Sequence, residues 1–279
     1  MYKITPEEYK VFSKYIHDIS GIILAGGKEY LIETRLNPIL TELGCKSFAE
    51  LYHKVRVDHT KTIEKKIIDA ISTNETYFFR DKAPFELIQH KIIPDLIDTR
   101  SKTALPGLPI KLRIWSAASS TGQEIYSIAI VLKELYLDPG KYEINLLGTD
   151  ISNAAITQAS YGKYNKFEMA RGLPPEKARK YFNQDENHWR IQDEIRSMAV
   201  FKKINLMQPL VGMGKFDIIF CRNVAIYFTP QERSRLYEKL AGVLEKDGYL
   251  LIGATESLTN DTKLFEPKKY LRTVFYQLK

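Results

Sequence analysis

Apolar residues recur at helical spacing from the start of the chain. A capping box at residues 5–8, with Pro6 at the first helical position, begins the first stripe, and Gly21 ends it. A second stripe runs from about 28 to 43 and contains Pro38. Proline inside a helix removes a backbone donor, so Pro38 predicts a kink or a late start of this helix.

Two more segments of the N-terminal region show the sequence pattern of a helix. A capping box at 47–50 predicts a third helix, and isoleucines spaced along 63–71 predict a fourth. A further helix is expected over 84–98. We therefore predict an all-helical N-terminal domain over residues 1–90.

After this domain the periodicity changes to apolar strands that alternate with helices. Strands are expected over 112–119, 142–150, 216–223, 249–256 and 271–278. Helices are expected over 122–137, from 152 onward, and from 230 to Gly248. Such alternation is typical of a mostly parallel sheet covered on both faces, which gives an α/β fold class for residues 91–279.

Two segments interrupt the second pattern. RSKTALPGLP, at 100–109, is the best linker candidate. Between about 162 and 203 a polar stretch holds a short helix at 175–182 and strand-like pieces at 189–195. We interpret it as a small inserted subdomain.

Composition excludes several classes of protein. An apolar fraction of 44% and a charged fraction of 27% are ordinary for a globular protein. The N-terminus has no apolar core of a secretory signal, and no stretch approaches a membrane span. Two distant cysteines argue against a disulfide framework, and the five histidines show no metal-ligand spacing. We expect a cytoplasmic protein without a metal and without direct membrane insertion.

The net charge of +7 predicts an acidic partner. The excess is concentrated at 161–215, with 11 Lys and Arg against 6 Asp and Glu. No basic run of the kind that follows a phosphate backbone occurs, so charge alone does not separate nucleic acid from an acidic protein surface.

Polar and small residues follow the expected parallel strands, where ligands bind in open α/β sheets. The first strand ends in the small-residue run 116–122, which is either a ligand-binding turn or only a tight turn. Asp150 ends the second strand; its carboxylate suits the two hydroxyls of a ribose, although a role at the start of the next helix is the alternative. No G-x-G-x-x-G is present, so a nucleoside-containing cofactor is favoured over a dinucleotide.

Two further segments extend this candidate site. Arg222 and Asn223 follow a third strand, and an internal salt bridge is the alternative role for Arg222. The joint 71–81, ISTNETYFFRD, carries three consecutive aromatics between polar residues, which a plain connection would not need.

Five motifs in order resemble the chemotaxis receptor methyltransferases, the CheR family. They are NETYFFRD, WSAASSTGQE, GTDIS, NL and FCRNVAIYF, and the resemblance covers the whole chain. It implies a Rossmann-like class I methyltransferase domain with a small inserted β-subdomain. It also implies that S-adenosylmethionine is used to methylate glutamates on the cytoplasmic helical bundle of chemoreceptors.

The resemblance also assigns site residues. The implied cofactor-binding residues are Asn74, Thr76, Arg80, Glu124, Asp150, Asn205, Leu206, Arg222 and Asn223. Asp150 would hold the ribose, and Glu124 the ammonium of the methionine part. Arg80 and Tyr227 are the candidates for orienting the acceptor. The aromatics of the joint would form the pocket wall, with docking of the two domains as the alternative.

The implied acceptor sets the chemistry. A glutamate carboxyl has a pKa of roughly 4.3 and is ionised near neutral pH, so no general base is needed. The inserted segment is short and lacks glycines of the kind found in relatives that dock on a receptor-tail pentapeptide. We therefore expect activity that does not depend on such a tether.

Two other functions stay open at this point. A nucleic-acid methyltransferase would fit the basic charge, but an N/D-P-P-Y/F/W motif is absent from the strand end at 222–225. A non-catalytic module that binds S-adenosylmethionine as a signal is the other. A nucleic-acid partner is not expected, and a monomer is the default.

Overall fold

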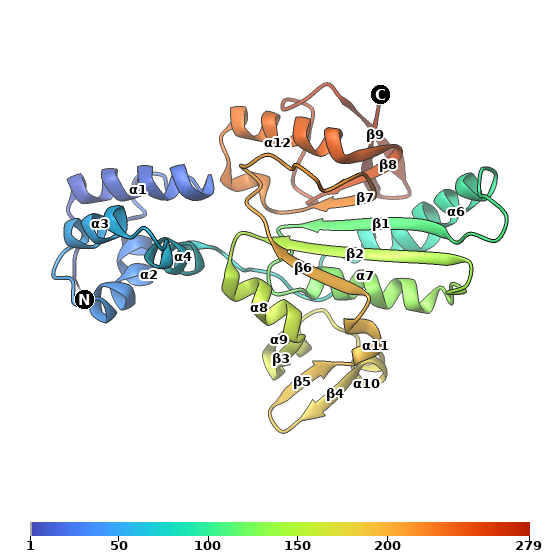
Figure 1. Cartoon of the computed structure of the whole chain (residues 1–279), viewed down its shortest axis with the longest axis horizontal. Helices are drawn as coiled ribbons and strands as arrows, with labels where there is room; N and C mark the ends of the chain where they lie inside the picture. The colour runs from blue at the N-terminus through green and yellow to red at the C-terminus, as the bar shows by residue number, and fades with distance from the viewer. Residues whose placement is uncertain (1) are drawn as a thin grey trace.

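Four helices form the N-terminal domain of the computed structural model, which describes residues 2–279 (Figure 1). They are α1 (Pro6–Ser20), α2 (Glu29–Glu42), α3 (Phe48–Val57) and α4 (Thr62–Ile71). The predicted capping box is present, because the Thr5 side chain accepts from the N–H of Glu8 and the Glu8 side chain accepts from that of Thr5. Apolar stripes meet in one core around the fully buried Phe12, Ile32 and Leu36.

Helix α2 runs through Pro38. It begins at Glu29, so the alternative of a late start is wrong. Pro38 is exposed, on the side of the helix away from the buried Leu36 and Leu40, where its ring meets solvent and not the packed core.

A seven-stranded sheet forms the second domain, in the order β6-β2-β1-β7-β8-β10-β9. Its strands are β1 (Ile110–Ala117), β2 (Tyr142–Asp150), β6 (Ala199–Lys203), β7 (Phe216–Cys221), β8 (Leu244–Ile252), β9 (Phe265–Tyr270) and β10 (Thr273–Leu278). The pairs from β6 to β8 are parallel, while β10 is antiparallel to both β8 and β9. This is the α/β architecture that the sequence predicted.

Alternating residues of the strands pack on the two faces of the sheet. Ile114 and Phe220 belong to one core, which also contains α5 (Ala83–Leu87), η1 (Ile88–Ile92), α6 (Ile93–Ser101) and α7 (Gln123–Glu134). Trp115 and Cys221 belong to the opposite core, with α12 (Pro230–Val243). Helix α8 (Asn153–Tyr161) follows β2 and is capped by the side chain of Ser152. In Figure 1, α12 and α7 lie on opposite sides of the central strands.

The inserted subdomain is a three-stranded antiparallel sheet with short helices. It contains β3 (Lys163–Asn165), α9 (Lys166–Ala170), α10 (Pro175–Tyr181), β4 (Phe182–Asp185), β5 (His188–Ile191) and α11 (Asp193–Arg196), with the strand order β3-β5-β4. Only Glu186 and Asn187 separate β4 from β5. It projects from the sheet beside α8, as the yellow part of Figure 1 shows.

Several expectations about the elements were wrong. Helix α12 ends at Val243, not Gly248, because Leu244 pairs with Phe216 and begins β8. The strand-like piece at 189–195 ends at Ile191, where a short helix follows. Strand β9 was not expected; its exposed lysines and Pro267 hide it in the sequence.

The boundary between the core of the helical domain and the core on the sheet lies earlier in the chain than the domain boundary expected from the sequence. The core of the helical domain ends at Ile71, whereas Phe78 and the residues up to Leu96 pack in the core on one face of the sheet. The helix expected over 84–98 therefore covers the sheet, although the sequence pattern placed the domain boundary at 90. Across residues 2–279, no helix combines the length and apolar character required to cross a membrane.

Candidate functional site

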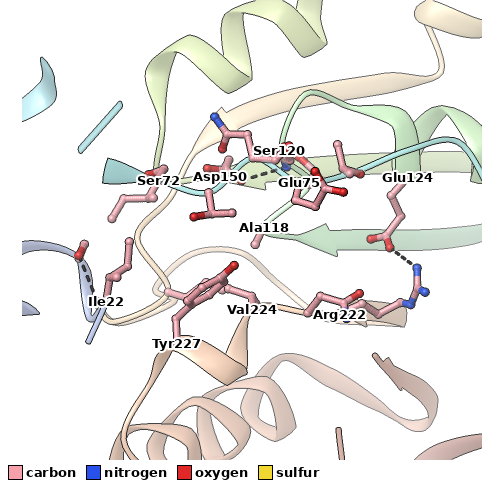
Figure 2. A pocket seen from close by; sticks show the side chains of 18 of the residues that line it. Ile22, Ser72, Glu75, Ala118, Ser120, Glu124, Asp150, Arg222, Val224 and Tyr227 are labelled. Carbon is pink, nitrogen blue, oxygen red and sulfur yellow. Dashed lines mark hydrogen bonds and ion pairs between the residues drawn. The ribbon is translucent and has the colours of Figure 1, made fainter. Parts of the chain in front are cut away.

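One pocket lies where the strand order reverses between β1 and β7, at the carboxyl ends of both strands. It encloses about 950 Å³, including the space at its open mouth. All the residues implied for the site line it: Asn74, Thr76, Arg80, Glu124, Asp150, Asn205, Leu206, Arg222, Asn223 and Tyr227. Figure 2 shows Asp150 and Ser120 on one side of the pocket and Tyr227 and Val224 on the other.

Asp150 is buried at the end of β2, where two backbone donors hold its carboxylate. Its Oδ2 accepts from the N–H of Ser120 at 2.9 Å, and its Oδ1 accepts from that of Ser152 at 2.9 Å. Burial raises the pKa of Asp150 above its ordinary value, against the lowering effect of these hydrogen bonds. Each oxygen keeps a free lone pair that a ligand hydroxyl can use.

The small-residue turn after β1 brings backbone close to the pocket. Ala118 and Ser120 have positive φ values of 62° and 51°, a conformation that is uncommon for residues other than glycine. Gly122 has φ 95°, and a Cβ there would lie 2.9 Å from the Cβ of Ala159 in α8. The turn is therefore fixed by packing against α8, with Ser119 and Ser120 lining the pocket.

Arg222 is the centre of an internal ion-pair network. Its Nη1 donates to Oε2 of Glu124 at 2.7 Å, and its Nη2 donates to Oδ2 of Asp81 at 2.6 Å. Its side chain is only 1% exposed. Oε1 of Glu124 accepts from the hydroxyl of Ser116 at 2.8 Å. Arg222 thus has the internal salt-bridge role that the sequence left as the alternative, and the dashed line between Arg222 and Glu124 in Figure 2 marks this pair. Arg222 also borders the pocket.

The segment after β7 supplies the opposite wall. Asn223 has φ 57°, and a short 3₁₀ helix, η2 (Ala225–Tyr227), follows it. Asn223, Val224 and Tyr227 line the pocket. The Oδ1 of Asn223 is buried and has no hydrogen-bond partner among residues 2–279.

The N-terminal domain completes the pocket. The last residue of α1, Ser20, and Ile22 in the loop after it line the pocket. The N–H of Ile23 donates to the carbonyl of Tyr227 at 3.1 Å, and Nδ2 of Asn205 donates to the carbonyl of Ile19 at 3.0 Å. Sequence reasoning missed Ser20 and Ile22, because nothing local in the sequence places the end of α1 against the segments that follow β6 and β7.

The aromatics of the joint 71–81 do not form the pocket wall. Phe78 is fully buried and packs edge-to-face on Tyr164 and Phe182 of the inserted subdomain, with ring centroids 5.0 and 5.4 Å away. Phe79 packs on Phe85 under the sheet. None of Tyr77, Phe78 and Phe79 is among the pocket residues, so the expectation that they wall the pocket was wrong. Docking of the two domains, the alternative, does not describe them either, because Phe78 and Phe79 belong to the core on the sheet and not to the core of the helical domain.

Tyr77 is held from outside the pocket. The guanidinium of Arg171 lies 4.5 Å from the centre of its ring, and Arg171 also pairs with Glu75. Gly172 touches the joint so closely that a Cβ there would lie 2.1 Å from the carbonyl oxygen of Phe78. The inserted subdomain therefore holds the joint on the side away from the pocket. The polar residues of the joint, Asn74, Thr76 and Arg80, line the pocket.

A parallel sheet whose strand order reverses beside a buried Asp at the end of its second strand is typical of the Rossmann-like class of folds, which bind nucleotide cofactors at this edge. Sequence comparison gives the family. The CheR methyltransferase SAM binding domain matches residues 74–274, and the CheR methyltransferase all-alpha domain matches residues 7–72. The chain belongs to the CheR methyltransferase family, and its cofactor is S-adenosylmethionine.

Curated relatives are similar to this chain over nearly its full length. A chemotaxis protein methyltransferase of Vibrio parahaemolyticus is 37% identical over 279 residues, covering 99% of this chain and 98% of the relative. Chemotaxis protein methyltransferase 1 of Pseudomonas aeruginosa is 35% identical, covering 91% of each chain. One from Borreliella burgdorferi is 36% identical, covering 94% and 92%. The protein is therefore an S-adenosylmethionine-dependent methyltransferase of chemotaxis.

Proposed function

We propose that this enzyme forms methyl esters on glutamate side chains of the cytoplasmic helical bundle of chemoreceptors. The supporting observation is one pocket between the two domains that gathers all the implied residues, in a chain of the CheR family. The enzyme would act in the cytoplasm, with a monomer as the default state.

The residues present fit the cofactor. Asp150 offers free lone pairs to ribose hydroxyls, and the buried Oδ1 of Asn223 offers an acceptor with no partner in the described part of the chain. S-adenosylmethionine, when bound, supplies an electrophilic methyl group on a sulfonium. Asn74, Thr76, Asn205 and Leu206 are proposed to complete its binding site.

Glu124 was expected to bind the ammonium of the methionine part, but its carboxylate also has partners within the protein. Both of its oxygens already accept hydrogen bonds, from Ser116 and Arg222, so its charge is largely balanced inside the protein. It retains lone pairs for an ammonium group, and we propose that it shares its charge between Arg222 and the cofactor. Arg222 would then act mainly by holding Glu124 in place.

Acceptor chemistry follows from ionisation. A glutamate with a pKa of roughly 4.3 is already a nucleophile at neutral pH, so the enzyme has to orient it and exclude water. Tyr227 lies across the pocket from Asp150 in Figure 2, and Arg80 borders the pocket from the joint. These two residues are proposed to orient the acceptor carboxylate, Tyr227 through its hydroxyl and Arg80 through its charge.

The inserted subdomain supports independence from a receptor-tail pentapeptide. Its β4–β5 connection has only two residues, Glu186 and Asn187, and Glu186 takes a left-handed conformation with φ 48°. So short a turn leaves no loop that could close over a docked peptide. Receptor fragments with and without a C-terminal pentapeptide are expected to be methylated at equal rates. A clear preference for the tailed fragment would contradict this proposal.

The reaction class is tested by methyl transfer from labelled S-adenosylmethionine to a receptor cytoplasmic fragment. Treatment with mild alkali should release the label as methanol, because carboxyl methyl esters hydrolyse there. A fragment with its methylatable glutamates changed to alanine is the matched control and should stay unlabelled. Alkali-stable label would contradict the proposal and favour nitrogen methylation. Cofactor binding without transfer to any receptor of a panel would favour a non-catalytic module.

A further inference from the structure

Glu256 lies just outside the pocket and ties together two strand ends that reach it. Strand β8 ends at Ile252, and a turn over 253–256 follows, in which the N–H of Glu256 donates to the carbonyl of Gly253 at 2.9 Å. The Oε2 of Glu256 accepts two backbone hydrogen bonds, from Gly253 and from Asn223, both at 2.7 Å. One carboxylate oxygen therefore joins the segment after β7 to the segment after β8.

The segment that Glu256 holds is the pocket wall from Asn223 to Tyr227. Asn223 has φ 57°, a conformation that costs free energy unless neighbouring contacts maintain it. The hydrogen bond from its own N–H to Glu256 is such a contact. The segment continues directly into Val224 and Tyr227, so this hydrogen bond lies at the start of the pocket wall.

Neighbouring residues pack closely around the carboxylate of Glu256. A Cβ on Gly253 would lie 2.5 Å from Oε2 of Glu256 and 2.8 Å from Nδ2 of Asn223. Burial raises the pKa of Glu256, whereas the two backbone donors and the nearby charge of Arg222 lower it. Oε1 is buried and unpartnered among the described residues, so all of the observed hydrogen bonding passes through Oε2.

We propose that Glu256 is a positioning residue for methyl transfer: it holds Asn223 and Tyr227 in the geometry that binds the cofactor and orients the acceptor. It touches neither reactant and acts through the backbone of Asn223. Charge-assisted hydrogen bonds from N–H groups to a carboxylate are about twice as strong as neutral ones, which suits the task. The inference rests on the proposed cofactor site.

The test measures the affinity for S-adenosylhomocysteine by calorimetry, together with kcat and KM for a receptor fragment. Glu256→Ala is expected to weaken the affinity and lower kcat by roughly tenfold or more, the size expected for one lost charge-assisted hydrogen bond. In Glu256→Gln the amide oxygen can still accept both N–H groups, so this variant should stay within about threefold of wild type. Gly253→Ala, which crowds Glu256 without removing it, should fall between them.

Asp217 provides the matched control, because it is a buried carboxylate on β7, the strand that leads into the pocket wall, but lies near the opposite end of that strand. It accepts from the N–H of Arg113 at 2.8 Å and pairs with Arg100. Asp217→Ala should lower stability while the folded protein keeps wild-type affinity and kcat. Equal losses in Asp217→Ala and Glu256→Ala would show a global effect and overturn the inference.

Three further outcomes are decisive. Wild-type affinity and kcat in folded Glu256→Ala would overturn the positioning role while leaving the proposed site intact. If Glu256→Ala does not fold, Gly253→Ala and Glu256→Gln are compared instead. Equal affinity and equal kcat in these two variants would overturn the positioning role. Wild-type affinity in Asp150→Asn would instead show that the proposed cofactor site is wrong, and the inference about Glu256 would fall with it.

Discussion

Replacing Arg222 by methionine tests the ion-pair network that supports the pocket. Methionine retains most of the apolar stem but removes the guanidinium from a side chain that is 1% exposed. The carboxylate of Glu124, 12% exposed, would keep only the hydroxyl of Ser116 as a partner. Asp81 is 31% exposed and can be rehydrated, so most of the cost comes from Glu124.

The magnitude follows from that burial. Leaving one member of a buried pair without its partner costs about 3–5 kcal/mol, so Arg222→Met should be destabilised by that amount. For a domain of this size such a loss lowers Tm by on the order of 10 °C. Adding Glu124→Gln removes the orphaned charge, and the double variant should recover about half of the loss or more. Asp81→Asn alone should cost about 1 kcal/mol or less, because that pair is partly exposed.

Urea unfolding followed by tryptophan fluorescence measures these values, since Trp115 is fully buried in the central strand β1. Trp189 lies in the inserted subdomain, and its replacement by phenylalanine leaves Trp115 as the single reporter. The reasoning is refuted if Arg222→Met loses less than about 1 kcal/mol, the range of an exposed pair. It is also refuted if the double variant is no more stable than Arg222→Met.

Three further predictions concern the pocket and the joint. Asp150→Asn should weaken S-adenosylhomocysteine binding by about tenfold or more, measured by calorimetry. Ligand hydroxyls favour the ionised carboxylate and burial raises the pKa of Asp150, so wild-type affinity should fall as pH drops through that raised pKa. The difference between wild type and Asp150→Asn should shrink over the same range, and a constant difference would contradict the assignment. Gly172→Ala should cost about 1–3 kcal/mol, because its Cβ meets the carbonyl of Phe78 and its φ is 79°. The control Gly26→Ala, with nothing within 4 Å of the added Cβ, should change the free energy of unfolding by less than about 0.5 kcal/mol. Asn205→Ala should cost about 0.5–1.5 kcal/mol and speed proteolysis of the joint, since it removes the hydrogen bond to Ile19; unchanged proteolysis would count against a docking role.

Local signals in the sequence determined where most elements begin. The capping boxes at Thr5 and Thr229 are present, and both helices start beside them, because these hydrogen bonds join residues three positions apart. The carboxyl ends of parallel strands meet at one edge of a sheet, so the sequence also placed Asp150, Arg222 and the turn 116–122 together.

Tertiary structure decided the partners of those residues and the bounds that depend on pairing. Arg222 and Glu124 lie 98 positions apart, and Phe78 packs on Tyr164 and Phe182, which are distant from it in the sequence. Helix α12 ends where Leu244 pairs with β7, a contact that no helical periodicity encodes.

Glu256 shows the limit of local reading most clearly. In the sequence it is the last residue of the strand expected over 249–256, and only the adjacency of β7 and β8 brings its oxygen to the N–H of Asn223. Sequence by itself determined the chemical groups of this enzyme and the edge of the sheet where they gather. The packing of distant segments decided which of these groups face the pocket and which hold the others in place, because burial and pairing are properties of the assembled fold.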